Sequence, residues 1–121
     1  MPAAPSPQPA VASGTVSVQA FDFVAVSFRV ERAGSLTGSV DWTNAANDLD
    51  SAVVRGRCSR EQFIAGAQGC DQRATLLVSL NKPSTFALPV EAGDYTLVIV
   101  SFGPGSDTAS YRLESEGSVS T

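Results

Sequence analysis

The chain has 121 residues, of which 43% are hydrophobic and 17% are charged, and its net charge is 8 − 12 = −4 at pH 7. This length fits one globular domain, and the mild acidity argues against a nucleic-acid partner. No segment approaches the roughly 18 apolar residues that a membrane helix needs. The chain has no histidine, which excludes Ser-His-Asp, Cys-His and histidine-ligated zinc sites.

Proline dominates the start of the chain. Residues 1–13 hold four of the seven prolines, a composition that favours an extended arm or linker, either disordered or docked. This stretch has neither the charged nor the apolar region of a signal peptide. We therefore expect an arm at residues 1–13, a β domain at residues 14–117 and a short tail at residues 118–121.

Beyond Gly14, apolar residues recur at every second position. The alternation runs through residues 26–31 (VSFRVE), 35–43 (SLTGSVDWT), 85–90 (TFALPV) and 110–115 (SYRLES), and turn sequences such as EAGD separate the runs. Strict alternation over short runs indicates half-buried strands, so the sequence predicts an all-β antiparallel sandwich. Trp42 falls on an inward face, where we expect a core residue rather than an exposed stacking residue.

Polar oxygen-bearing side chains gather in residues 39–54, which read SVDWTNAANDLDSAVV. Asn47, Asp48 and Asp50, with Asn44 nearby, are the kinds of ligand that calcium takes from an irregular loop. The alternative is a polar turn in which Asn47 and Asp48 bond to the backbone. Calcium bound at Asn47, Asp48 and Asp50 is thus one hypothesis, and no cofactor at all is the other.

Two cysteines, Cys58 and Cys70, flank a polar loop without a CxxC motif. A Cys58–Cys70 disulfide would contribute about 3 kcal/mol and would indicate an oxidising compartment; two thiols are the alternative. The loop segment SREQFIAGA has room for a short helical turn. Its apolar pair, Phe63 and Ile64, either anchors the loop to the core or forms an exposed contact.

The segment DYTLVIVSF, residues 94–102, is apolar on both faces. A strand of this kind needs cover on both sides. Neighbouring loops are one source of cover. The other is the proline-rich arm or a partner, and in that case Val98, Val100 and Phe102 form an interaction face.

The order of these elements resembles the bacterial pre-peptidase C-terminal domain family. The matching motifs are DLD at residues 48–50, AGDY at residues 92–95, and the final pair Tyr111 and Leu113. Ser51 departs from the family pattern, where a large apolar residue is common, and the cysteine loop is longer than usual. The resemblance implies a jelly-roll-like sandwich of about eight strands in a secreted, non-catalytic module appended to exported enzymes. Some relatives bind calcium or adhere to insoluble polymers such as collagen.

Catalysis finds little support in the remaining residues. Asp48 and Asp50 have the spacing of a carboxylate pair, but one tryptophan and two tyrosines are too few to build a sugar cleft. We expect a non-catalytic secreted module that binds an extracellular protein or polymer. The alternative is a self-associating surface protein in which the arm docks on a neighbouring subunit along a sheet edge or the two-faced strand.

Overall fold

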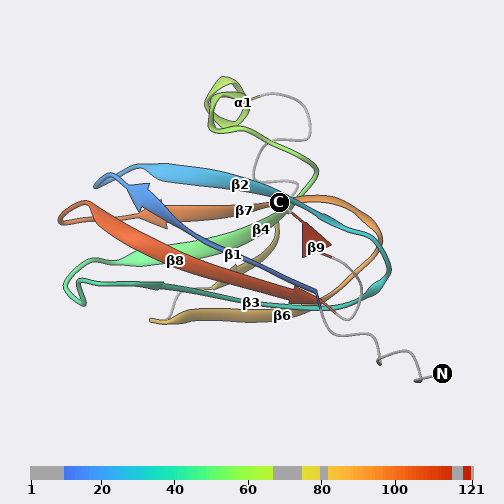
Figure 1. Ribbon diagram of the computed structural model, residues 1–121. Coiled ribbons are helices and arrows are strands. Elements are labelled where there is room, and N and C mark those ends of the chain that lie inside the picture. The colour runs from blue at the N-terminus through green and yellow to red at the C-terminus, as the bar shows by residue number, and fades with distance from the viewer. Residues whose placement is uncertain (1–9, 67–74, 80–81, 116–118, 121) are drawn as a thin grey trace.

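The computed structural model describes residues 10–66, 75–79, 82–115 and 119–120, which form two antiparallel sheets packed face to face (Figure 1). The first sheet has the order β1 (Ala10–Val18), β8 (Asp107–Ser115), β3 (Gly34–Trp42), β6 (Ser84–Val90). The second sheet has the order β5 (Thr75–Ser79), β4 (Leu49–Arg55), β7 (Gly93–Ser101), β2 (Phe23–Val30), β9 (Val119–Ser120). From β1 to β8, every consecutive pair of strands except β4 and β5 lies in opposite sheets. This is jelly-roll connectivity, so the predicted fold class is confirmed.

The predicted alternation places the core between the sheets. Phe28 and Val30 from β2 meet Leu36 and Val40 from β3, and all four are buried in one apolar cluster. Trp42 belongs to the same cluster, as the sequence predicted. Because side chains of a strand alternate between its faces, the polar residues of these runs lie on the outer faces, which turn away from the opposite sheet.

Glycine makes room for two aromatic rings inside the first sheet. Gly38 on β3 pairs with Phe86 on β6, and a Cβ added at Gly38 would overlap the Phe86 ring. Gly14 on β1 pairs with Tyr111 on β8, and its added Cβ would lie 2.8 Å from the tyrosine oxygen. These cross-strand pairs fix the register, since a slip of one residue would set each ring against a side chain.

The sheets extend further along the chain than the sequence predicted. Strand β1 begins at Ala10, inside the predicted arm, and residues 10–13 pair with β8. At the other end, β9 falls inside the predicted tail and pairs with Arg29 and Val30. Residues 1–9 lie outside the described part of the chain. None of the helices formed by the described residues is long and apolar enough to cross a membrane.

The predicted helical turn is α1 (Arg60–Ala65), which stands outside the sandwich in Figure 1. Ser59 begins it with a capping box: its hydroxyl accepts from Gln62 N at 3.2 Å, and its own N–H donates to Gln62 Oε1 at 2.7 Å. Gly66 ends it at φ 67°, in the left-handed region. The segment that follows β4 thus contains one short helix that is capped at both ends.

Candidate binding surface

The polar stretch after Trp42 folds as a loop held from the inside. Trp42 Nε1 donates to Asn47 O at 3.0 Å, which places the asparagine against the core. The buried Asn47 carboxamide accepts from Gly105 N at 2.9 Å and donates to Asp107 Oδ2 at 3.0 Å. Asn47 therefore bonds both to the backbone, as a turn asparagine does, and to a distant carboxylate.

Asp107, the first residue of β8, holds this loop in place, and no sequence pattern marks it. Its carboxylate accepts from Thr43 N and Oγ1, Asn44 N, Asn47 Nδ2 and Thr108 N, over distances of 2.6 to 3.1 Å. Burial acts to raise the pKa of Asp107, but the hydrogen bonds from Thr43, Asn44 and Asn47 outweigh it and hold that pKa well below its usual range. A buried anion thus organises the turn between β3 and β4.

The three proposed calcium ligands are turned to different environments. Asn47 is buried and engaged with residues 105–107, whereas Asp48 is exposed. Asp50 is half-buried on the outer face of β4, and burial together with the nearby Asp48 charge raises its pKa. Within the described ranges, no three acidic or cysteine side chains gather as a metal site would need. Calcium at Asn47, Asp48 and Asp50 stays a prediction.

The predicted disulfide falls partly outside the described residues. Cys58 is buried, and it is not a free thiol. Its N–H donates to Thr96 Oγ1 at 2.9 Å, so the chain at this point lies on the outer face of β7. Cys70 is not among the described residues, and its bond to Cys58 stays a prediction.

The chain after β4 lies on the outer face of β7, next to the predicted interaction face. Thr96 Oγ1 donates to Gly56 O at 2.7 Å, and Val98, two residues further along β7, is buried without belonging to the cluster between the sheets. The two-faced strand therefore finds its second cover largely within its own chain. Of the three residues predicted to form the face, Val98 is buried, Val100 is half-buried, and only Phe102 is well exposed.

The exposed Phe102 lies next to a second exposed aromatic residue, Phe21, which the sequence analysis overlooked. Their side chains are 54% and 76% exposed. Asp22 O accepts from Ser101 N at 2.9 Å, which brings the β1–β2 turn beside the end of β7. The Phe21 ring covers Gly103, where an added Cβ would lie 2.6 Å from the ring. We call Phe21, Phe102 and the half-buried Phe23 and Val100 the aromatic patch.

Phe21 holds an unusual backbone conformation. Asp22 N donates to Gln19 O at 3.2 Å, which closes a turn, and Phe21 is its third residue with φ 59°. Glycine or asparagine is common at such a position, because a bulky side chain there costs about 1–3 kcal/mol. No other non-glycine residue in the described part of the chain has a positive φ.

The helix α1 borders the aromatic patch. Phe63 packs edge-on against Phe23 with ring centroids 6.0 Å apart, while Ile64 is 62% exposed. Phe63 therefore holds the loop against the outer face of β2 rather than against the core, and Ile64 is exposed. Arg60 lies over the Phe23 ring and pairs with Asp22 at 2.9 Å, so the patch has a charged rim.

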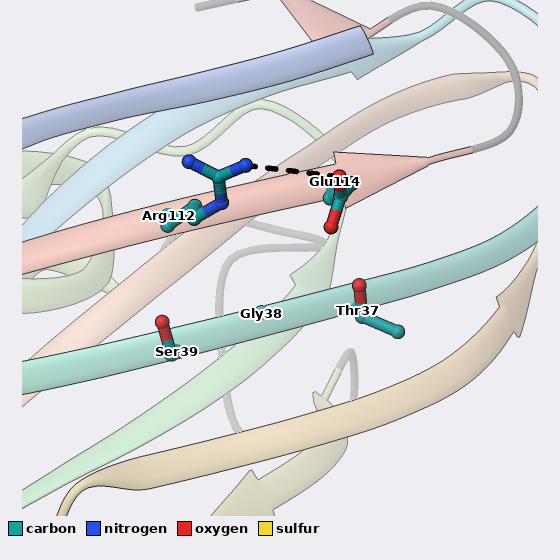
Figure 2. A pocket seen from close by; sticks show the side chains of 5 residues that line it. All are labelled: Thr37, Gly38, Ser39, Arg112 and Glu114. Carbon is teal, nitrogen blue, oxygen red and sulfur yellow. Dashed lines mark ion pairs between the residues drawn. The ribbon is translucent and has the colours of Figure 1, made fainter. Parts of the chain in front are cut away.

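The opposite side of the sandwich carries a shallow polar depression (Figure 2). Thr37, Ser39, Arg112 and Glu114 border it above Gly38, and its volume is about 160 Å³. Arg112 Nη2 lies 3.7 Å from Glu114 Oε1, so the charge of each group is balanced within the depression. Among the residues whose burial the structure describes, this face offers hydroxyl groups and no exposed large apolar side chain.

A second polar depression, of about 320 Å³, lies over Asp107 at the end of the sandwich. Ser17, Gln19, Thr43, Asn44, Ser106 and Thr108 complete its lining. Because the oxygens of Asp107 already accept five hydrogen bonds, the carboxylate serves the loop rather than a solvent-borne ligand. The aromatic patch is therefore the stronger candidate for a binding surface.

No protein-family model matches the chain, and no curated protein matches its sequence. Solved structures match its fold. The mitogen from Yersinia pseudotuberculosis has a TM-score of 0.61 at 15% identity, with 88% of this chain and 86% of that chain covered. PliG of Aeromonas hydrophila, a periplasmic inhibitor of g-type lysozyme, has a TM-score of 0.59 at 10% identity, with 93% and 92% covered.

The pre-peptidase C-terminal domain of a collagenase from Bacillus anthracis matches with a TM-score of 0.55 at 16% identity, and 89% of each chain is covered. The family resemblance seen in the sequence is thus supported as a likeness of fold. At these identities the three similarities extend to the fold alone, and they carry no residue of a binding site to this chain.

Proposed function

We propose that this protein is a non-catalytic binding module that acts outside the cytoplasm and contacts a partner protein through the aromatic patch. The observation that carries the proposal is the pair of exposed residues Phe21 and Phe102, whose chain segments are joined by the Ser101 N–Asp22 O hydrogen bond at one end of the second sheet. Large aromatic residues with a polar rim are enriched in protein interfaces, where they supply most of the binding energy.

The conformation of Phe21 supports this role. Glycine would adopt the φ of 59° at position 21 with less strain than phenylalanine does. The Phe21 ring is exposed, so its burial contributes little free energy to folding. Strain of this kind is found where a side chain is needed in one place for a purpose other than stability. Phe21→Gly should therefore leave the fold intact and remove the more exposed of the two rings.

The fold similarities add coarse support. One of the matching structures is an inhibitor of g-type lysozyme and another is a pre-peptidase C-terminal domain, and the inhibitor is periplasmic. From these two structures we carry over to this chain only a general role, namely binding by a small β-sandwich outside the cytoplasm. The buried Cys58 and its predicted bond to Cys70 fit the same compartment.

Site-specific photo-crosslinking in the native host tests the proposal. A benzophenone amino acid at Phe102 should form a discrete adduct with one protein, because that position lies at the centre of the patch. The same amino acid at Thr37, exposed on the opposite side of the sandwich, is the matched control and should form none. Equal adducts at both positions, or none at Phe102, would overturn the proposal. An adduct between two copies of this chain would instead support the self-associating alternative.

A further inference from the structure

Strand β2 forms the flank of the second sheet, and its outer edge is paired over only part of its length. On one side, β7 pairs with every residue from Phe23 to Val30. On the other side, β9 pairs only with Arg29 and Val30. In the part of the chain that the structure describes, residues 23–28 have no strand on that side. An unpaired edge offers a row of main-chain donors and acceptors to another strand.

The direction of the main chain identifies which groups are on offer. Asp22 O accepts from Ser101 N, so the main chain of residue 22 faces β7. Successive residues of an antiparallel strand point their main-chain N–H and C=O groups to opposite sides. Because residue 22 faces β7, these groups of Phe23, Ala25 and Ser27 face the open flank. The Phe23 N–H is satisfied by its neighbour, Asp22 Oδ1, at 2.8 Å. Ala25 and Ser27 remain to pair with an added strand.

Half-buried apolar side chains line the margin between the two sheets along this flank, and we call this margin the slot. Val24 and Val26 on β2 and Val16 on β1 pack against the core, yet all three are only half-buried. At the end where β9 is present, the slot is closed: Val119 is 6% exposed and belongs to the core cluster beside Val30. The short strand β9 thus shows what the slot accepts, which is an aliphatic side chain from an antiparallel strand.

Within residues 23–28, the edge lacks the sequence features that usually prevent strand addition. Residues 23–28 read FVAVSF, with no charge and no proline, and the β2–β7 pairing has no bulge over this stretch. Natural edges commonly carry lysine, proline or a bulge to prevent another strand from pairing. The six open residues span about 20 Å, the length of an ordinary strand.

We propose that the open edge of β2 binds an extended segment of a partner protein that adds to the second sheet as a strand. The segment runs antiparallel to β2, continues the line of β9, bonds to Ala25 and Ser27, and places aliphatic side chains at alternate positions into the slot of Val16, Val24 and Val26. This site lies on the flank of the sandwich, whereas the aromatic patch lies on the outer face, so the inference goes beyond the proposed function.

Amide hydrogen exchange of the full chain, followed by NMR, tests the inference with the capped peptide SVSVSVS as the probe. Exchange at Ala25 and Ser27 should slow by at least about tenfold at saturating peptide, because strand pairing protects edge amides. The capped peptide VVVSSSS has the same composition but can place only two valines at alternate positions on one face, and it should give much weaker protection. Unchanged exchange with SVSVSVS, or equal protection by both peptides, would overturn the inference.

Two variants of matched chemistry locate the site. Val26→Lys puts a charge into the slot and should abolish protection by SVSVSVS. Leu88→Lys makes the same change at a half-buried residue of β6, on the edge of the other sheet, and should leave protection unchanged. The reverse pattern would contradict the assignment. Protection that grows with protein concentration in the absence of peptide would also overturn it, since the occupant would then be a second copy. If Val26→Lys does not fold, the two peptides still decide the question.

Discussion

Replacing Asp107, the first residue of β8, by asparagine should destabilise the protein more than any single polar substitution within the β3–β4 loop. The carboxylate accepts from Thr43 N, Asn44 N and Thr108 N as well as from two side chains. An asparagine keeps one acceptor oxygen but turns an NH₂ group toward donors that then have no acceptor. Hydrogen bonds to a charged group contribute about 1.5–3 kcal/mol each and are not additive. We expect a loss of about 3 kcal/mol.

That loss should be visible as a fall in melting temperature of about 10 °C, given roughly 3–5 °C per kcal/mol for a domain of this size. Urea unfolding at several pH values adds a second readout. The pKa of Asp107 is lowered in the folded state, so its contribution is fully present above the unfolded-state value of about 4 and is lost as pH falls below it. The difference between the native protein and Asp107→Asn should therefore shrink in acid.

Asp41 provides the matched control. Its carboxylate lies on β3 and is exposed, and in the described part of the chain it accepts from the neighbouring Trp42 N–H and from Lys82 Nζ at 2.7 Å. Asp41→Asn should change the unfolding free energy little. An Asp107→Asn protein within about 1 kcal/mol of the native one, with the same acid dependence, would refute the view that a buried anion organises the loop.

Three further outcomes are expected. Gly38→Ala should cost about 1–3 kcal/mol, and Phe86→Leu should relieve part of that cost in the double variant, because the added Cβ meets the Phe86 ring; additive effects in urea unfolding would contradict this packing. Without reductant, Ellman's reagent should find no thiol in denaturant, and reduction of Cys58 and Cys70 should lower stability by about 3 kcal/mol; two titrating thiols would rule out the bond. Thermal melts in EDTA and in millimolar calcium test the calcium hypothesis, which requires a calcium-dependent rise in melting temperature that Asp50→Asn abolishes and is rejected by identical melts.

The fold could be predicted because its main determinant is local. Alternation in runs such as VSFRVE and SLTGSVDWT reports which side chains are buried, and glycine-rich turns separate the runs. Trp42 and Leu36 fall in the core as the pattern indicates. The start of β1 was misplaced, since Ala10 to Ser13 carry small residues and follow prolines, and their pairing with β8 depends on a strand at the far end of the chain.

The candidate site was harder to predict because its contacts are not local. Asn47 was singled out as a possible ligand, but its carboxylate partner Asp107 lies 60 positions away and follows an ordinary turn sequence. The sequence indicates that the strand at residues 94–102 needs a second cover, yet it does not show that Gly56 and Cys58 bond to Thr96 on the outer face of that strand. Phe21 carries no local signal at all, since an aromatic residue before a strand is usually buried.

The affinity of the protein captured at position 102, measured by calorimetry with the purified partner, tests the central claim most directly. The double variant Phe21→Gly, Phe102→Ser should bind that partner at least about thirtyfold more weakly than the native protein, as expected when two central aromatic contacts are removed. Its melting temperature should not fall, because both rings are exposed and glycine suits the turn at residue 21. An affinity within about twofold of the native value would contradict the assignment of the aromatic patch as the binding surface.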